Sequence, residues 1–324
     1  MVDLTDEQAA IYDRQIRIWG AGVQKRLMEA KVLVLGCTPL AAEVTKNVVL
    51  AGVGNLSLID STPSADMHMT FLSMHNVKVP QPATAADVFA TGLQEMNPMI
   101  KVATLAGSSS EVPSSAVIKE FHLVLCFGEH CGVYAQVNEV CRECGVKFMC
   151  SASRGGMVWG FADLLTHSCS LNIDQNAVSA KHQLELKYVA LRDCVKLPWA
   201  GMSRNDKRQV NGFLGPWTVI AELEIREGRL ACEGDMPAIL EKGQQVLSEQ
   251  HCPPKFWDGA AAAQYFSGLD EVAPANAVAG GFLANDVVRC VSEAGLPTYN
   301  VLLYSIANNV TQVHNLSGGN SVEC

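Results

Sequence analysis

The stretch VLVLGCTPLA at positions 32–41 decides the fold, because an apolar strand, a turn and the start of a helix follow one another in it. In a dinucleotide-type turn the first glycine permits the sharp bend, the second lets the backbone approach a phosphate, and the third allows close helix–strand packing. Gly36 fills the first place, Thr38 the second and Ala41 the third. The stretch therefore predicts a nucleotide-type βα unit that lacks the glycines to hold phosphates well.

Thr38 and Pro39 favour a different role for this turn. A β-branched residue stands where the phosphate should approach, and Pro39 removes one backbone donor from the start of the helix. Threonine followed by proline is also a good pair for a helix N-cap and first turn. We favour a helix start without a ligand.

Asp60 ends the next predicted strand, 24 positions after Gly36, about where a ribose-binding acid belongs. The alternative is an aspartate that caps the turn at 61–63, Ser-Thr-Pro. Without a competent phosphate loop, the cap is the preferred interpretation.

Composition limits the function classes. The chain has 324 residues, 48% of them hydrophobic, which predicts one buried core rather than a disordered chain. Its 24 basic and 33 acidic residues give a net charge of -9, which disfavours nucleic acid and anionic membranes and favours a basic partner surface. Neither an apolar leader nor a membrane-spanning stretch is present, so we expect a soluble, intracellular protein.

The twelve cysteines stand among hydrophobic neighbours and predict reduced, buried thiols rather than a disulfide framework. Cys141 and Cys144 form one CxxC pair late in a helical pattern. A single pair is a weak zinc signal, so packing is the favoured explanation and we expect no metal in this chain.

Strand and helix patterns alternate through the first half of the chain. We expect strands at 31–35, 55–60, 101–105, 123–127, 147–150 and 157–165, and helices at 40–53, 86–96, 114–120 and 133–144. Apolar strands in such repeated βα units predict an α/β fold with a mostly parallel sheet and helices on both faces.

The alternation breaks in the middle of the chain. We expect the amino-terminal part of the fold at 1–167, a divergent helical insertion at 168–256 with helices at 215–226 and 236–248, and the carboxyl-terminal part at 257–324. The last part should contain a helix at 276–293 and strands at 299–304 and 310–314.

The segment Tyr12–Gly20 contains two arginines, an acid, a glutamine and two aromatic residues. The fixed fork of donors on a guanidinium suits phosphate oxygens. The alternative from composition alone is a solvated helix with Ile16 and Trp19 docked on the core.

Gly280 and Gly281 lie inside the last predicted helix, where each glycine costs about 1 kcal/mol relative to alanine. Another backbone element therefore packs close to this helix. That element belongs either to the same chain or to a partner subunit.

Together the segments 12–20, 31–36, 43–53, 96–99 and 271–281 resemble the ubiquitin-like-protein activating enzymes, and among them most of all the smaller, Aos-type subunits of SUMO-activating enzymes. The resemblance implies a Rossmann-like ThiF/MoeB-type adenylation fold and a noncatalytic but required subunit of a nuclear and cytoplasmic heterodimer. The larger partner subunit would hold ATP, magnesium, the catalytic cysteine and a structural zinc, and would adenylate the carboxyl-terminal glycine of SUMO. Arg14 would act in trans on the ATP phosphates of the partner, and this chain would bind no cofactor itself.

The departures from the family pattern agree with an inactive subunit. An active subunit would have an Asn-x-x-Arg element and a lysine after Asp60, but residues 61–76 contain neither arginine nor lysine. After the strand at 123–127, where an active subunit would carry an aspartate for the metal, this chain has Gly128, Glu129 and His130, and no metal role is assigned to Glu129. The insertion is also too short for a full catalytic-cysteine domain, so no thioester-forming cysteine is assigned.

Three other functions stay open from the sequence. The chain would be a partner-type subunit for another ubiquitin-like modifier, an oxidoreductase that binds NAD through Gly36 and Asp60, or a scaffold without a role in the chemistry.

Overall fold

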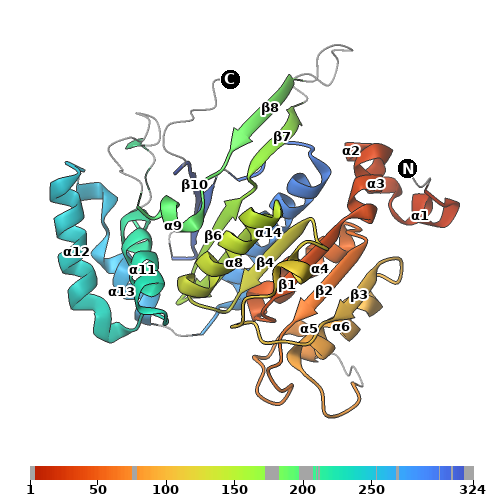
Figure 1. The fold of residues 1–324 in the computed structure, drawn as a ribbon, viewed down its shortest axis with the longest axis horizontal. Helices are drawn as coiled ribbons and strands as arrows, with labels where there is room; N and C mark the ends of the chain where they lie inside the picture. Colours follow the sequence, from red (N-terminus) through yellow and green to blue (C-terminus); the bar gives the residue numbers. More distant parts are fainter. Residues whose placement is uncertain are drawn as a thin grey trace.

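An eight-stranded mixed sheet forms the centre of the molecule (Figure 1). The computed structural model describes residues 4–74, 79–171, 182–196, 207–208, 210, 212–252, 254–267, 270–298, 300–307 and 309–316. The strand order is β10-β9-β6-β5-β4-β1-β2-β3. Parallel pairing joins the first five strands: β1 Lys31–Leu35, β2 Asn55–Ile59, β3 Lys101–Thr104, β4 Leu123–Phe127 and β5 Lys147–Arg154. Antiparallel pairing adds β6 Met157–Asp163, β9 Val301–Ser305 and β10 Val310–His314.

The direction of the connections reverses beside β1. From β1 the chain proceeds to its neighbours β2 and β3, and then returns to the other side of β1 to form β4. Ligands of open α/β sheets bind outside the carboxyl ends of the strands at such a switch point.

Helices cover both faces of the sheet, and the alternation of side chains along β1 shows why. Val32 and Val34 contact one hydrophobic cluster, while Leu33 and Leu35 contact the other. The first cluster includes residues of α3 Ala21–Glu29, α4 Pro39–Leu50, α6 Ala85–Met96 and α14 Ala273–Ser292. The second includes residues of α7 Ser115–Ile118, α8 Cys131–Cys144, α11 Leu214–Glu227, α12 Met236–Glu249 and α13 Gly259–Ser267. A sheet buried on both faces requires the near-continuous apolar strands of this sequence.

The remaining elements are short. They are α1 Asp6–Ile11, α2 Asp13–Trp19, α5 Phe71–Met74, α9 Leu191–Cys194 and the 3-10 turns Glu233–Asp235 and Pro254–Phe256. Helices α1, α2 and α3 lie together beside the amino terminus (Figure 1). None of the helices in the described residues is long and apolar enough to cross a bilayer.

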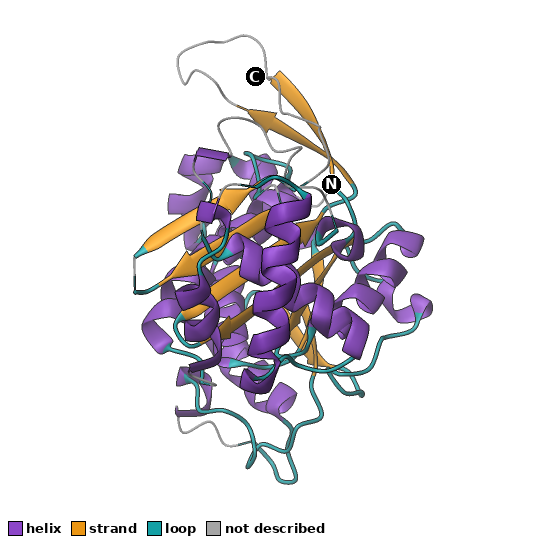
Figure 2. Cartoon of the chain, turned by 90° about the vertical axis from the view of Figure 1, so that its left-hand side faces the viewer, coloured by secondary structure: helices purple, strands orange, loops and turns teal. Residues whose placement is uncertain are grey.

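The predicted α/β sheet with helices on both faces is confirmed, and most predicted elements occur within a few residues of their expected ends. The middle of the chain differs. The sequence predicted a helical insertion here, but the region begins with a hairpin of β7 Thr166–Leu171 and β8 His182–Lys187. The hairpin projects beyond the main sheet (Figures 1 and 2). Helix α11 of the same region packs on α8 and so belongs to a layer of the core. The predicted division into three segments is not tested by these observations, and Tyr299 lies outside the described residues.

Candidate functional site

A cavity of about 380 Å³ opens at the switch point, at the carboxyl ends of β1, β2, β4 and β5. Gly36 follows β1 and Asp60 follows β2, while Gly128 follows β4 and Ser153 lies near the end of β5. Pockets of this size hold small molecules and cofactors.

Gly36 is required by the geometry of the turn. Its φ is +90°, and a Cβ at this position would overlap the carbonyl of Phe127 at the end of β4. Its own amide donates to the Ile59 carbonyl at 3.1 Å. Gly36 therefore provides the sharp bend and the close backbone contact that the first glycine of a dinucleotide-type turn provides.

Thr38 and Pro39 begin helix α4 as the sequence predicted. Thr38 is the N-cap with extended backbone, its Oγ1 accepts from the Ala41 amide at 3.2 Å, and Pro39 occupies the first turn. The Thr38 methyl group lies 2.7 Å from where a Cβ on Gly128 would stand, so it fills space over the end of β4.

Asp60 is buried and bonds to two backbone amides. Its Oδ1 accepts from Thr62 at 2.9 Å, which is the turn cap predicted from the sequence. Its Oδ2 accepts from Cys37 at 2.7 Å, a contact across the loop that was not predicted. Burial, followed by the charge of Asp60, raises the pKa of the Cys37 thiol well above 9.

Glu271, just before α14, is the residue that the sequence analysis missed. Its Oε2 accepts from the Leu40 amide in the first turn of α4 at 2.6 Å and from Nδ2 of Asn276 at 2.7 Å. Burial raises the pKa of Glu271 to about 7, although hydrogen bonds from Leu40, Asn276 and Thr38 oppose the shift. The only sequence signal was its place at the start of the segment 271–281.

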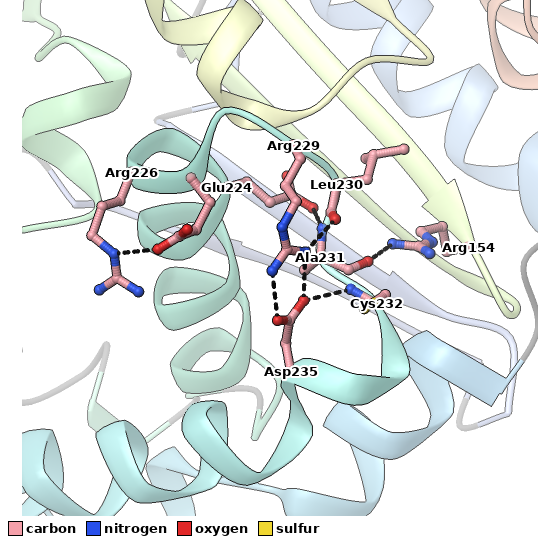
Figure 3. A network of polar contacts seen from close by, with 9 residues as sticks. Arg154, Glu224, Arg226, Arg229, Leu230, Ala231, Cys232 and Asp235 are labelled. Atoms are coloured by element: carbon pink, nitrogen blue, oxygen red, sulfur yellow. Dashed lines mark hydrogen bonds and ion pairs between the residues drawn. The ribbon is translucent and has the colours of Figure 1, made fainter.

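The far wall of the cavity is held by β5 and the segment after α11. Arg154 donates to the Ala231 carbonyl at 2.9 Å (Figure 3) and stacks 5.2 Å from the ring centre of Tyr265. Glu224 is buried and accepts from the Cys131 and Ala231 amides at 3.0 and 3.1 Å.

A surface ion pair holds the loop that follows α11. Two bonds of 2.8 and 2.7 Å join the Arg229 guanidinium to Asp235 (Figure 3). They hold the pKa of the Asp235 carboxyl well below its usual range. The loop therefore keeps Ala231 in reach of Arg154.

Acidic groups outnumber basic ones around the cavity. Its lining includes the carboxylates Asp60, Asp66, Glu129, Glu224 and Glu271, against the guanidinium of Arg154. Glu129, the candidate substitute for a metal-binding aspartate, accepts from Ser109 at 2.9 Å. Such a lining gives a negative potential, which repels phosphates.

Arg14 lies on the exposed surface of α2 and makes no hydrogen bond or ion pair with any residue that the structure describes. By contrast, Arg17 pairs with Asp13 at 2.8 Å. The segment Tyr12–Gly20 is docked as a helix on the core: Tyr12 is buried, and Nε2 of Gln15 donates to the Leu50 carbonyl at 3.0 Å.

This docking separates Arg14 from the cavity. Leu50 ends α4, whereas Thr38, which lines the cavity, stands at its beginning. Twelve helical residues span roughly 18 Å, so Arg14 lies far from Gly36 and Asp60. The structure brings Gly36, Thr38 and Asp60 together and leaves Arg14 apart.

The paired glycines of α14 have different surroundings. A Cβ on Gly280 would stand 2.7 Å from Cβ of Glu43, so close packing on α4 of the same chain explains this glycine. Gly281 has open space around it, and Val278 and Phe282 on the same face are 42% and 46% exposed.

Most described cysteines are buried as predicted, but Cys232 is exposed and Cys144 and Cys252 are partly exposed. All described cysteines are free, and Cys141 of the CxxC pair is buried in α8. The thiol of Cys144 points toward the Ser115 carbonyl at 3.8 Å. In the described part of the chain, no group of three or more histidine, cysteine or acidic side chains is arranged to hold a metal ion.

The sheet order and the pocket at its switch point define a Rossmann-like α/β protein with an adenylation-type fold. The chain belongs to the ThiF family, whose model matches residues 12–324. Among solved structures, E. coli MccB with a variant of MccA aligns at a TM-score of 0.53 and 13% identity, over 99% of this chain and 75% of MccB. At this identity the likeness shows the fold alone, and it confirms the predicted ThiF/MoeB-type architecture.

Relatives of nearly equal length align with almost all of this chain. SUMO-activating enzyme subunit 1B-1 of Arabidopsis thaliana is 28% identical over 97% of this chain and 98% of its own. Subunit 1 of Rattus norvegicus is 25% identical over 99% and 95%. DNA damage tolerance protein rad31 of Schizosaccharomyces pombe is 23% identical over 97% and 99%. The resemblance stated from the sequence is thereby confirmed.

Proposed function

We propose that this chain is the smaller, noncatalytic but required subunit of a heterodimeric SUMO-activating enzyme. The end-to-end match to proteins named SUMO-activating enzyme subunit 1 supports this assignment. In the proposed complex, which acts in the nucleus and cytoplasm, the larger subunit holds ATP and magnesium and adenylates the carboxyl-terminal glycine of SUMO. ThiF membership favours this function over the NAD-dependent oxidoreductase considered from the sequence.

The observation that carries the proposal is the position of Arg14. Its guanidinium has no partner among the described residues, and its segment contacts the end of α4 that is remote from the cavity of its own chain. An exposed, unpaired guanidinium can bind phosphate oxygens in a neighbouring subunit. There it would stabilise the charge that develops during adenylation.

The surface for the larger subunit should include the outer face of α14. Gly281 leaves room for close backbone approach, and exposed apolar side chains flank it. Ile18, on the same helix as Arg14, is 81% exposed. Contact with α2 and α14 together would bring the arginine to the partner across a large, obligate interface.

ATP–pyrophosphate exchange in the presence of SUMO tests the proposal. The chain alone should show no ATP–pyrophosphate exchange, whereas the reconstituted heterodimer should show exchange. Arg14→Ala should lower exchange by about tenfold or more, because removal of a phosphate-binding arginine weakens charge stabilisation, while size-exclusion chromatography still shows the heterodimer.

Arg17→Ala is the matched control, because Arg17 lies on the same short helix but is paired with Asp13. It should change exchange little. Undiminished exchange by the Arg14 variant would remove the assigned role and leave a scaffold. Co-purification followed by identification of the bound modifier distinguishes SUMO from other ubiquitin-like proteins.

A further inference from the structure

The turn between β1 and α4 has little hydrogen-bonding capacity left for a ligand. Pro39 has no amide hydrogen. Five other amides of the turn donate to groups of the chain itself: Gly36 to the Ile59 carbonyl, Cys37 to Asp60, Leu40 to Glu271, Ala41 to Thr38 Oγ1 and Ala42 to the Thr38 carbonyl. Among the described residues, no acceptor faces the Thr38 amide.

Two of these acceptors are carboxylates from distant parts of the chain. The amino end of a helix, with free amides and a positive dipole end, is the usual place for a phosphate. Glu271 places its Oε2 2.6 Å from the Leu40 amide there, and Asn276 in the first turn of α14 holds the same oxygen.

We propose that Glu271 is a built-in anion which, with Asp60, occupies the phosphate position of the turn and bars a triphosphate from this pocket. The inference deepens the proposed function, since it rests on this chain holding no nucleotide. A phosphate entering the turn would have to displace a carboxylate from the helix and would meet the charge of both.

Glu271 is the better of the two residues to vary. Asp60 also caps the turn at Thr62, so its loss would disturb the loop itself. Glu271 reaches the turn from the start of α14, so its replacement does not change the residues that form the Thr38 cap and the Gly36 bend.

Calorimetric titration of the full chain with inorganic pyrophosphate at pH 8 and low ionic strength tests the inference. Pyrophosphate isolates the phosphate contacts from those of a nucleoside. Glu271→Gln removes the charge and keeps the shape of the side chain. Glu271→Ala also removes the side-chain oxygen that accepts from the Leu40 amide at the start of α4. We expect the dissociation constant to fall about tenfold or more in Glu271→Gln, and at least as much in Glu271→Ala, because a like charge in contact is removed.

Glu129→Gln is the matched control, since Glu129 lines the same cavity but does not bond to α4. Its dissociation constant should change by less than about threefold, because Glu129 accepts from Ser109 and is not bonded to an amide of the turn. An equal gain in this variant, or no gain in either Glu271 variant when thermal melting shows it folded, would overturn the inference. Tight binding by the wild-type chain would instead contradict the proposal that its pocket is incompetent, independently of the exchange assay on Arg14.

Discussion

Replacing Glu271 by glutamine should change how stability depends on pH. Burial raises the pKa of Glu271 from 4.5 to about 7, so the folded chain binds a proton more tightly than the unfolded chain. Its contribution to the free energy of unfolding is fully present below pH 4.5 and is lost as pH rises toward 7. A difference of about 2.5 pKa units corresponds to about 3.4 kcal/mol over the whole range.

The measurable window is narrower, because the sequence pI of about 5.4 favours association at lower pH. Between pH 6 and 8.5, about 1.4 kcal/mol of the loss should still develop. The dipole of α4 favours the carboxylate by about 0.3–1 kcal/mol and reduces the expected loss to about 1 kcal/mol.

Urea unfolding followed by tryptophan fluorescence, at several pH values in this window, measures the effect. The quantity to compare is the free energy of unfolding of the wild type minus that of Glu271→Gln, because other titrating groups cancel in it. The neighbouring Asp60 and Cys37 are present in both proteins. We expect the difference to fall by about 1 kcal/mol from pH 6 to 8.5. A difference that stays constant or rises would refute the reasoning.

Two further substitutions test packing near the proposed interface and the arginine segment. Gly280→Ala should destabilise the chain by about 1–3 kcal/mol, because its Cβ would press on Glu43. Gly281→Ala should instead stabilise the isolated chain by about 0.5–1 kcal/mol and weaken heterodimer formation. Thermal melting measures the two stabilities and size-exclusion chromatography measures heterodimer formation, and equal effects of the two substitutions would contradict this expectation. Tyr12→Phe should lower the free energy of unfolding by about 1–3 kcal/mol, because Nδ2 of the buried Asn97 then loses the Tyr12 hydroxyl to which it donates at 2.8 Å. Urea titrations measure this change, and an unchanged free energy of unfolding would show that the hydrogen bond does not anchor the segment.

The parts of the site that sequence could predict are local. The bend at Gly36, the cap by Thr38 and Pro39, and the turn cap by Asp60 each depend on residues within a few positions. Strand and helix patterns likewise gave the sheet, because the strands are apolar on both faces.

What could not be predicted depends on contacts distant in sequence. Glu271 and Leu40 are 231 positions apart, and no local pattern indicates that they meet. The hairpin was missed although polar and apolar residues alternate at 183–186, because this pattern is short. For Gly280, the sequence indicated close packing but left its partner open, and only the position of Glu43 identified α4.

The length of α4 between the cavity and the segment of Arg14 has a consequence for genetics. Substitutions whose sites are more than about 10 Å apart and share no partners usually have additive free energies. Changes in the turn and changes in the arginine segment should therefore combine as independent factors. Either feature can be altered, repaired or redesigned while the other serves as an internal reference.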